Sequence, residues 1–372
     1  MAHNKIKVLE IIGFYSLEEI SEYIDKGNKF PKHHLWGYDK LIEAGFTVDE
    51  MLYNKNSFLN KIGRFIHITN LEQQIKIIKN NKNYDIIYAE NAAEILIVAL
   101  LRLSGIIKTP LLGILHTTTN YSHKNIIKRN LLKLHRTILL NGMDKILYIN
   151  KQTYFADLKY GKIPQKHSFL RSWGVDVSFF DEFIQNQHEK PTNQYFFSTG
   201  GSNRDFHLLH DAFANVECKL VISTKYEKDF FNSSSSNIVV DNSIPFGFDS
   251  AAKLLPYYYN AKAFCIALKD KVEMCTGLTV IFESMAMGKP IITTKNEFYS
   301  LDVEESGVGL NVDFNDKAGW INAINYMIEN PDIAASMGIK GKALCKEQYN
   351  YDLFCAELIQ NIENVIINNQ AN

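Results

Sequence analysis

The chain has 372 residues, a formal net charge of −1, 46% apolar residues and 22% charged residues. This length suggests two domains, and the composition is that of an ordinary globular protein. A net charge this close to zero argues against a whole-protein electrostatic attraction to nucleic acid. The most apolar region, residues 92–115, is interrupted by Glu94, Arg102 and Lys108. It therefore predicts a core helix followed by a strand, and not a membrane span.

The five cysteines are scattered along the chain without a CxxC pair. Such spacing is typical of reduced thiols in a cytoplasmic protein. The first residues, MAHNKIKVLEIIGF, indicate a strand after a short polar start and not a signal peptide. We therefore expect a cytoplasmic protein.

Predicted strands and helices alternate through the first half of the chain. A β-branched run at 6–12 is followed by Gly13, a long loop, a helix over 35–42 and a strand over 47–53. A polar helical stretch (57–80), a strand (85–91), a helix (92–103) and a strand (110–115) come next. This order predicts an α/β fold with a parallel sheet. His116 directly follows the last of these strands, at the sheet edge where ligands bind, and is a candidate for chemistry.

Residues 123–140 form a predicted amphipathic helix with two interpretations. Ile127, Leu131, Leu134 and Ile138 share a narrow arc, and basic residues lie largely opposite. One interpretation is a helix that covers the sheet and exposes a basic face. The other is a patch through Lys124–Arg136 that docks on anionic lipid, which Leu132 and Leu139 slightly favour because they interrupt the basic face. It predicts a peripheral contact with the inner face of a membrane.

A polar linker at 181–194 separates this half from a second series of predicted strands and helices. The strand over 195–198 leads to Gly200 and Gly201, whose N–H groups could cradle a phosphate. Arg204 follows and could hold a phosphate with two hydrogen bonds. The alternative is a simple turn with a surface arginine.

The stretch from Glu273 to Thr294 predicts a turn, a helix and a buried strand. Gly277 supplies the turn, Gly288 ends the helix and Pro290 prevents its continuation. A helix that begins at such a loop presents free N–H groups and a partial positive charge, which suits a diphosphate. Glu283, one and a half turns further on, could accept hydrogen bonds from vicinal sugar hydroxyls. An acid there could instead only complement the helix dipole.

Residues 283–292, ESMAMGKPII, resemble the signature of the retaining GT-B glycosyltransferases of family 4. Weaker similarities lie around His34, at His116, at Trp173-Gly174-Val175-Asp176 and after Arg204. The resemblance implies two Rossmann-like domains that face each other across a cleft, with a last helix that crosses back to the first domain. We expect an acceptor domain at 1–185, a donor domain at 186–350 and the returning helix at 351–372.

The resemblance also implies roles for individual residues. Glu283 would hold the ribose of a nucleotide-sugar donor, with a UDP-sugar favoured. Arg204, Gly200, Gly201, Thr279 and the N–H groups of Gly277 and Leu278 would meet its diphosphate. His116 would face the transferred sugar, and Gly13 and His34 would lie on the acceptor side. The acceptor would be a glycan or a lipid-linked saccharide of a surface polysaccharide or glycolipid. The chain has no Asp-x-Asp pair near a strand end, so we expect no metal ion and no other cofactor.

The chain departs from the family pattern at two places. Cys275 stands eight residues before Glu283, where the family has its first glutamate, and the nearest acid is Glu273. Either Glu273 takes that role as a catalytic sugar contact or the contact is missing. Gly201 stands where the family has an arginine. These departures leave open a non-catalytic nucleotide-binding partner subunit and, in third place, another GT-B enzyme such as a nucleotide-sugar epimerase.

Overall fold

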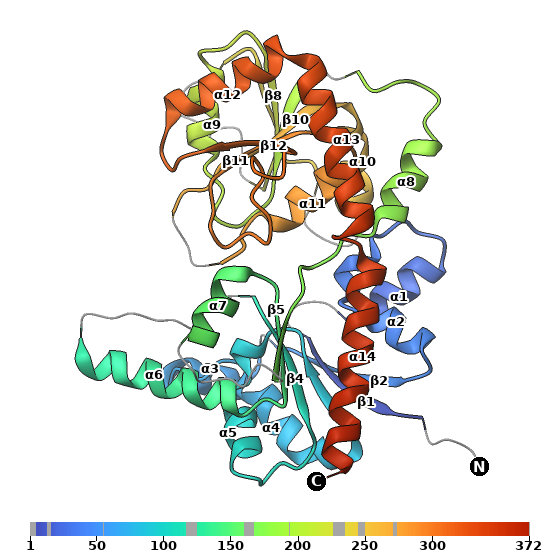
Figure 1. The fold of residues 1–372 in the computed structure, drawn as a ribbon, viewed down its shortest axis with the longest axis vertical. Coiled ribbons are helices and arrows are strands. Elements are labelled where there is room, and N and C mark those ends of the chain that lie inside the picture. Colours follow the sequence, from blue (N-terminus) through green and yellow to red (C-terminus); the bar gives the residue numbers. More distant parts are fainter. Residues whose placement is uncertain are drawn as a thin grey trace. The chain divides into compact units, whose positions relative to one another are not determined.

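The computed structural model describes residues 5–12, 16–54, 56–116, 125–159, 167–192, 194–225, 235–244, 250–270 and 274–371 (Figure 1). The chain divides into two compact units. The first comprises residues 1–26, 34–172 and 354–372, and the second comprises 27–33 and 173–353. Whereas the expected boundary followed residue 185, this division falls after residue 172.

The first unit contains a parallel sheet of six strands in the order β2-β1-β3-β4-β5-β6. Its strands are β1 (Lys7–Ile12), β2 (Thr47–Leu52), β3 (Ile86–Ala89), β4 (Leu111–Leu115), β5 (Lys145–Tyr148) and β6 (Ser168–Leu170). Strands β1, β3 and β4 are almost wholly buried, as expected for a parallel sheet covered on both faces. The predicted α/β class is confirmed.

Helices connect these strands. They are α1 (Leu17–Asp25), α2 (Tyr38–Glu43), α3 (Phe58–Phe65), α4 (Leu71–Asn80), α5 (Leu96–Leu103), α6 (Ile126–Asn141), α7 (Lys151–Lys159) and α14 (Tyr351–Gln370), with short 3-10 turns at Lys32–Leu35, Asn81–Asn83 and Ala92–Glu94. The long loop expected after β1 was wrong in part, because it contains α1. Ser16 caps this helix by accepting the N–H of Glu19 at 3.1 Å. The single helical stretch expected at 57–80 is two helices.

Helix α6 exposes its apolar stripe, whereas a helix that covers the sheet was expected to bury it. Its apolar stripe is exposed at Ile127, Leu131 and Leu134. The buried side is formed by Leu139, Leu140 and Arg136, whose guanidinium pairs with buried Asp157. An aliphatic pattern alone does not decide which face packs, because a buried ion pair can take the inner side of a helix when both partners are hydrogen-bonded.

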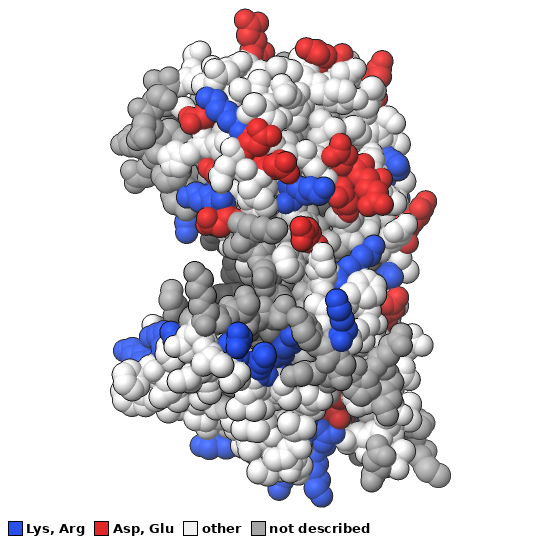
Figure 2. Space-filling model, turned by 60° about the vertical axis from the view of Figure 1, so that its left-hand side comes forward, with Lys and Arg blue, Asp and Glu red and all other residues white. Residues whose placement is uncertain are grey.

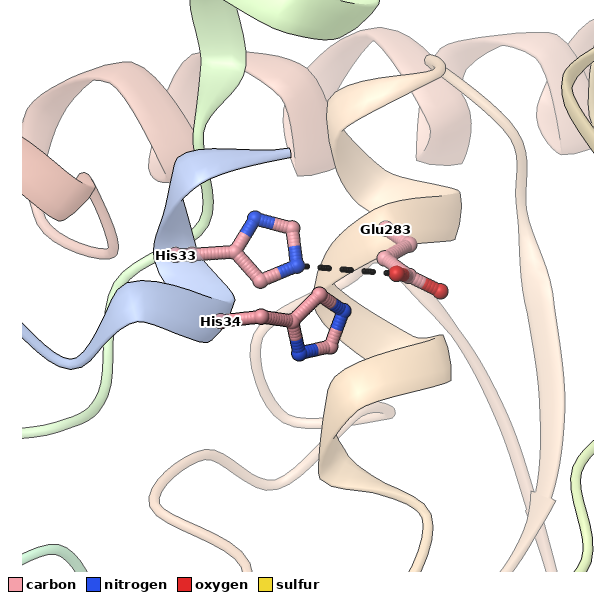
Figure 3. A group of neighbouring side chains, drawn as sticks. All are labelled: His33, His34 and Glu283. Carbon is pink, nitrogen blue, oxygen red and sulfur yellow. Dashed lines mark ion pairs between the residues drawn. The ribbon is translucent and has the colours of Figure 1, made fainter. Parts of the chain in front are cut away.

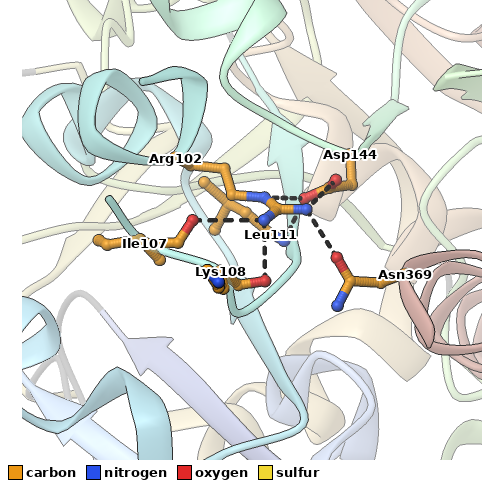
Figure 4. Close-up of polar contacts among 6 residues, drawn as sticks. All are labelled: Arg102, Ile107, Lys108, Leu111, Asp144 and Asn369. Carbon is orange, nitrogen blue, oxygen red and sulfur yellow. Dashed lines mark hydrogen bonds and ion pairs between the residues drawn. The ribbon is translucent and has the colours of Figure 1, made fainter. Parts of the chain in front are cut away.

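Arg102 ties the end of α14 to the rest of the first unit (Figure 4). Its Nε donates to Asp144 Oδ2 at 2.8 Å and its Nη2 to Asp144 Oδ1 at 2.6 Å. The same Nη2 donates to Asn369 Oδ1 at 2.9 Å. The two-point pairing fixes the guanidinium plane, so that one side chain links α5, the residue just before β5 and the last turn of α14.

The second unit repeats the architecture, with a parallel sheet in the order β12-β11-β10-β7-β8-β9. Its strands are β7 (Tyr195–Thr199), β8 (Lys219–Ser223), β9 (Ile238–Asp241), β10 (Ala261–Ile266), β11 (Ile291–Thr294) and β12 (Gly309–Val312). Its helices are α8 (Val177–Gln185), α9 (Phe206–Phe213), α10 (Ser250–Asn260), α11 (Leu278–Ala286), α12 (Lys317–Glu329) and α13 (Pro331–Glu347). One core joins α9, α12 and the inner strands around the fully buried Trp320.

None of the helices in the described part of the chain combines the length with the apolar character that crossing a bilayer requires.

Candidate donor-binding site

The loop after β7 places a buried arginine at the carboxyl edge of the second sheet. Arg204 is only 7% exposed, and it forms an isolated bridge with Leu268 next to β10. Its Nε donates to the carbonyl of Thr199 at 3.0 Å and its Nη1 to that of Ser202 at 2.9 Å. Asp205 follows as the cap of α9. The arginine is therefore held by the loop that carries it, at the edge where α/β sheets bind ligands.

Two glycines make room for this guanidinium. Gly200 has a φ of +112°, and a Cβ there would lie 2.7 Å from Arg204 Nη2. Gly277 has a φ of +105°, and its Cβ would lie 3.6 Å from Arg204 Nη1 and 2.8 Å from the hydroxyl of Tyr299. Residues with side chains rarely adopt this backbone conformation. The structure thus brings together Gly200, Arg204 and Gly277.

Helix α11 begins at Gly277 and directs its first turn toward the same loop. The N–H of Leu278 donates to the carbonyl of Cys275 at 3.1 Å. One of the two N–H groups that we expected to meet the diphosphate is therefore already engaged. Thr279 is half-buried in the same turn. The remaining helix N-terminus still favours an anion, because the aligned peptide dipoles leave a partial positive charge there.

Glu283 lies inside the unit, and its carboxylate is fixed by neighbouring side chains. It is 8% exposed, and its Oε2 accepts a hydrogen bond from the hydroxyl of buried Tyr258 of α10 at 2.8 Å. Burial and the Glu283 charge raise the pKa of Tyr258 well above its usual range, while Arg204 acts in the opposite direction. The tyrosine therefore stays a neutral donor, within electrostatic reach of both charged groups.

A histidine contacts the other oxygen of the same carboxylate (Figure 3). His33 is fully buried, and its Nε2 lies 3.5 Å from Glu283 Oε1. Its Nδ1 accepts the N–H of Asp176 at 3.1 Å, so the proton of a neutral ring resides on Nε2. The indole of Trp173 packs edge-on against the ring, with centroids 4.9 Å apart. His33 therefore presents an N–H to Glu283.

Burial also sets the ionisation of the groups around the glycine turn. It lowers the pKa of Arg204, which Tyr299 and Tyr258 partly offset, and raises the pKa of Tyr299 to about 12. Burial raises the pKa of the Cys275 thiol to about 11. A thiol with that pKa is protonated at neutral pH, which agrees with a packing residue and not with a nucleophile.

His116 belongs to the first unit and lies at the end of β4. Its Nε2 donates to the carbonyl of Glu90 at 2.6 Å, and its ring meets that of Trp36 edge-on at 4.8 Å between centroids. Burial lowers the pKa of His116, and the bond to Glu90 partly offsets this. The imidazole is therefore neutral at pH 7 and oriented at the sheet edge, where the sequence predicted it.

The remaining predicted residues are placed as follows. Gly201 is exposed in the loop before Arg204, and His34 is half-buried in the 3-10 turn of Lys32–Leu35. Figure 3 also draws His34, which belongs to the first unit while its neighbour His33 belongs to the second. Gly13, Lys124 and Glu273 lie outside the described residues.

Sequence reasoning missed the two partners of Glu283. Tyr258 lies in a tyrosine run, Tyr257–Tyr259, that gave no sign of which ring points inward. His33 is far from Glu283 in sequence, and the sequence pattern predicted a functional role for its neighbour His34 instead. A local signal existed only in the 3-10 turn itself, which carries two consecutive histidines.

The solved structures with this fold include three whose full length corresponds to this chain. HepE from Anabaena, in complex with UDP and glucose, is 15% identical with a TM-score of 0.63, covering 96% of this chain and 99% of HepE. Sucrose-phosphate synthase from Thermosynechococcus elongatus is 14% identical with a TM-score of 0.67, covering 98% and 100%. A glycosyltransferase from Rickettsia africae is 15% identical with a TM-score of 0.62, covering 98% and 99%. The fold is therefore GT-B, with two Rossmann-like units.

Residues 180–344 match the sequence model of the glycosyl transferases of group 1. No curated protein matches the chain. The matched region contains Arg204, Gly277 and Glu283, the residues around which the site is built. The resemblance to group 1 glycosyltransferases is thereby confirmed over these residues, which make up most of the second unit.

Proposed function

We propose that the enzyme transfers a sugar from a UDP-sugar, with retention of configuration, to a glycan or a lipid-linked saccharide. The observation that carries this proposal is the arrangement of Glu283 and Arg204. A buried carboxylate, held by Tyr258 and His33, lies on the helix that begins at Gly277, beside a guanidinium that packs against that same glycine. The pair would hold a ribose and a diphosphate. UDP is favoured because HepE, a structure of the same fold, was solved with UDP.

In this proposal the second unit stabilises the departing nucleotide. Charge develops on the diphosphate as the bond to the sugar breaks, and preorganised donors aimed at that charge are the largest source of acceleration in many enzymes. Arg204 and the N-terminus of α11 would supply these donors. Arg204 stays protonated even with a lowered pKa, since guanidinium groups do not lose their proton in proteins. These groups would take the part that a metal ion has in other transferases, so we propose turnover without a metal.

His116 and Glu273 are proposed on the sugar side, with Gly13 and His34 on the acceptor side. The neutral His116 side chain could hydrogen-bond a hydroxyl of the transferred sugar without bringing a charge to it. Retention is supported only by the likeness to the family, and NMR of the anomeric proton of the product would test it. A lipid-linked acceptor agrees with peripheral attachment to the inner face of a membrane through α6, whose apolar stripe is exposed.

Release of UDP from a panel of UDP-hexoses tests the proposal, with and without a saccharide acceptor and with and without EDTA. We expect release that depends on the acceptor and is unchanged by EDTA. Complete loss of turnover in EDTA would contradict the metal-free mechanism. Epimerised donor without acceptor would favour an epimerase. Tight UDP binding without any turnover would favour a non-catalytic partner subunit.

A further inference from the structure

Helix α3, like α6, carries an exposed apolar stripe. Phe58, Ile62 and Phe65 recur at helical spacing, and the C-cap Ile66 adjoins them. The rings of Phe58 and Phe65 are 73% and 87% exposed. The opposite side of the helix, with Asn60 and Gly63, is the buried one. Two phenylalanines so exposed on one short helix are unusual for a surface in contact only with water.

Helix α6 has the same construction. Ile127, Leu131 and Leu134 are 56–67% exposed on one arc, and the burial of Arg136, Leu139 and Leu140 fixes the other face inward. Both helices therefore present apolar stripes that the first unit itself leaves uncovered.

The two helices belong to one layer on one face of the first sheet. The connections β2 to β3, β3 to β4 and β4 to β5 all progress in the same direction across the sheet order. Right-handed crossovers then place α3, α4, α5 and α6 on the same face. The contacts agree, because α3 packs on α4, α4 on α5 and α5 on α6. Leu100 and Leu103 of α5 are also exposed between them.

The charges on this layer point to an anionic partner. Neither α3 nor α6 contains an aspartate or a glutamate, whereas both carry exposed cations: Lys61, Arg64, Lys128, Arg129 and Lys133. None of these five forms an ion pair with any residue that the structure describes, while Lys26, Lys40 and Lys76 on other helices do. Figure 2 shows blue side chains among white ones where α6 comes forward.

We propose that α3 and α6 together form one docking surface for an anionic lipid bilayer. Apolar side chains would enter the boundary between headgroups and acyl chains, and the cations would meet lipid phosphates, as for helices that lie in the interface. Long Lys and Arg stems can cover apolar surface while their charges stay at the headgroups. A protein partner fits less well, because lysine is depleted in protein interfaces. Docking needs no nucleotide, so its failure would leave the proposed reaction untouched.

Flotation of the full-length protein with vesicles tests this surface, using phosphatidylcholine alone or mixed with phosphatidylglycerol at low and high salt. We expect binding to the anionic vesicles that weakens in high salt. The variant Phe58→Gln/Phe65→Gln on α3 and the variant Leu131→Gln/Leu134→Gln on α6 should each bind about tenfold more weakly. Ile339→Gln is the matched control, since Ile339 is 71% exposed on α13 of the second unit.

Three results would contradict all or part of this proposal. Absence of binding by the wild type, or equal binding to neutral vesicles, would overturn the proposal. Wild-type binding by the α3 variant would overturn the part of α3. If an apolar variant lowers the thermal unfolding midpoint, Lys61→Gln/Arg64→Gln is tested in its place. This variant removes two charges and leaves every apolar side chain of the stripe unchanged. That variant should lose several-fold in affinity at low salt and little at high salt.

Discussion

Helices α11 and α6 both carry apolar residues at helical spacing, and the protein uses them in opposite ways. In α11 nearly every residue from Leu278 to Ala286 is buried, including Glu283. In α6 the apolar stripe is exposed and an arginine is buried. Periodicity therefore predicts that a helix forms, but not which side packs. The face is decided by the contacts that a charged residue can find inside, such as Asp157 for Arg136 or Tyr258 for Glu283.

The largest effect is expected at Arg204, which packs against Gly277 at the start of α11. Arg204→Ala should lower kcat/KM for donor turnover about 10²–10³-fold, because it removes a preorganised donor from the developing charge. Steady-state kinetics with a UDP-hexose checks this. Arg171→Ala is the control, because Arg171 is a partly buried arginine that pairs with Glu357 in the first unit. Equal kinetics for Arg204→Ala and the wild type would remove Arg204 from the site.

A smaller effect is expected at Tyr258. Tyr258→Phe keeps the ring and removes the hydroxyl that donates to Glu283 Oε2. The carboxylate should then be less firmly oriented. The Kd for UDP should rise about three- to tenfold, which corresponds to the free energy of one hydrogen bond. Calorimetry measures this. Tyr195→Phe, which also removes a hydroxyl bond in this unit, should leave the Kd unchanged. A larger loss for Tyr195→Phe would show that general loosening, and not Glu283, is responsible.

The smallest effect concerns His116 in the first unit. Its pKa is lowered by burial in the folded protein, so the unfolded chain binds the proton more readily. Folding stability that is complete above the ordinary histidine pKa of about 6.5 is then lost as the pH falls below it. His116→Gln cannot lose this contribution. Urea unfolding at pH 7 and pH 5 should therefore show a smaller drop in the free energy of unfolding for the variant than for the wild type. An identical drop would contradict a lowered pKa of His116 in the folded protein.

Much of the fold was readable from the sequence because buried parallel strands appear as short runs of branched apolar residues. In the second unit β8, β9 and β11 are such runs, KLVIS, IVVD and IITT. Gly277, Gly288 and Pro290 predicted the limits of α11. Helix α1 was missed because its residues, LEEISEYID, are mostly polar and its cap, Ser16, lies just after residues with no helical pattern.

The site was readable only where its residues lie within one segment. Arg204 and Glu283 could each be predicted from a local motif, namely a glycine loop before a helix and a helix between two glycines. The contacts of Glu283 could not, because Tyr258 lies on another helix and His33 comes from a short segment near the N-terminus that joins the second unit. Such contacts depend on the tertiary arrangement, which no spacing rule encodes.

Titration calorimetry of UDP, GDP and ADP against the wild type and Glu283→Ala tests the central claim most directly. Because a hydrogen bond to a charged group contributes roughly 1.5–3 kcal/mol, the variant should bind its nucleotide about ten- to a hundredfold more weakly. We expect UDP to bind to the wild type with micromolar affinity and Glu283→Ala to lose most of that affinity. If UDP binds equally to both proteins, or to neither, Glu283 does not hold the nucleotide and the donor site is elsewhere.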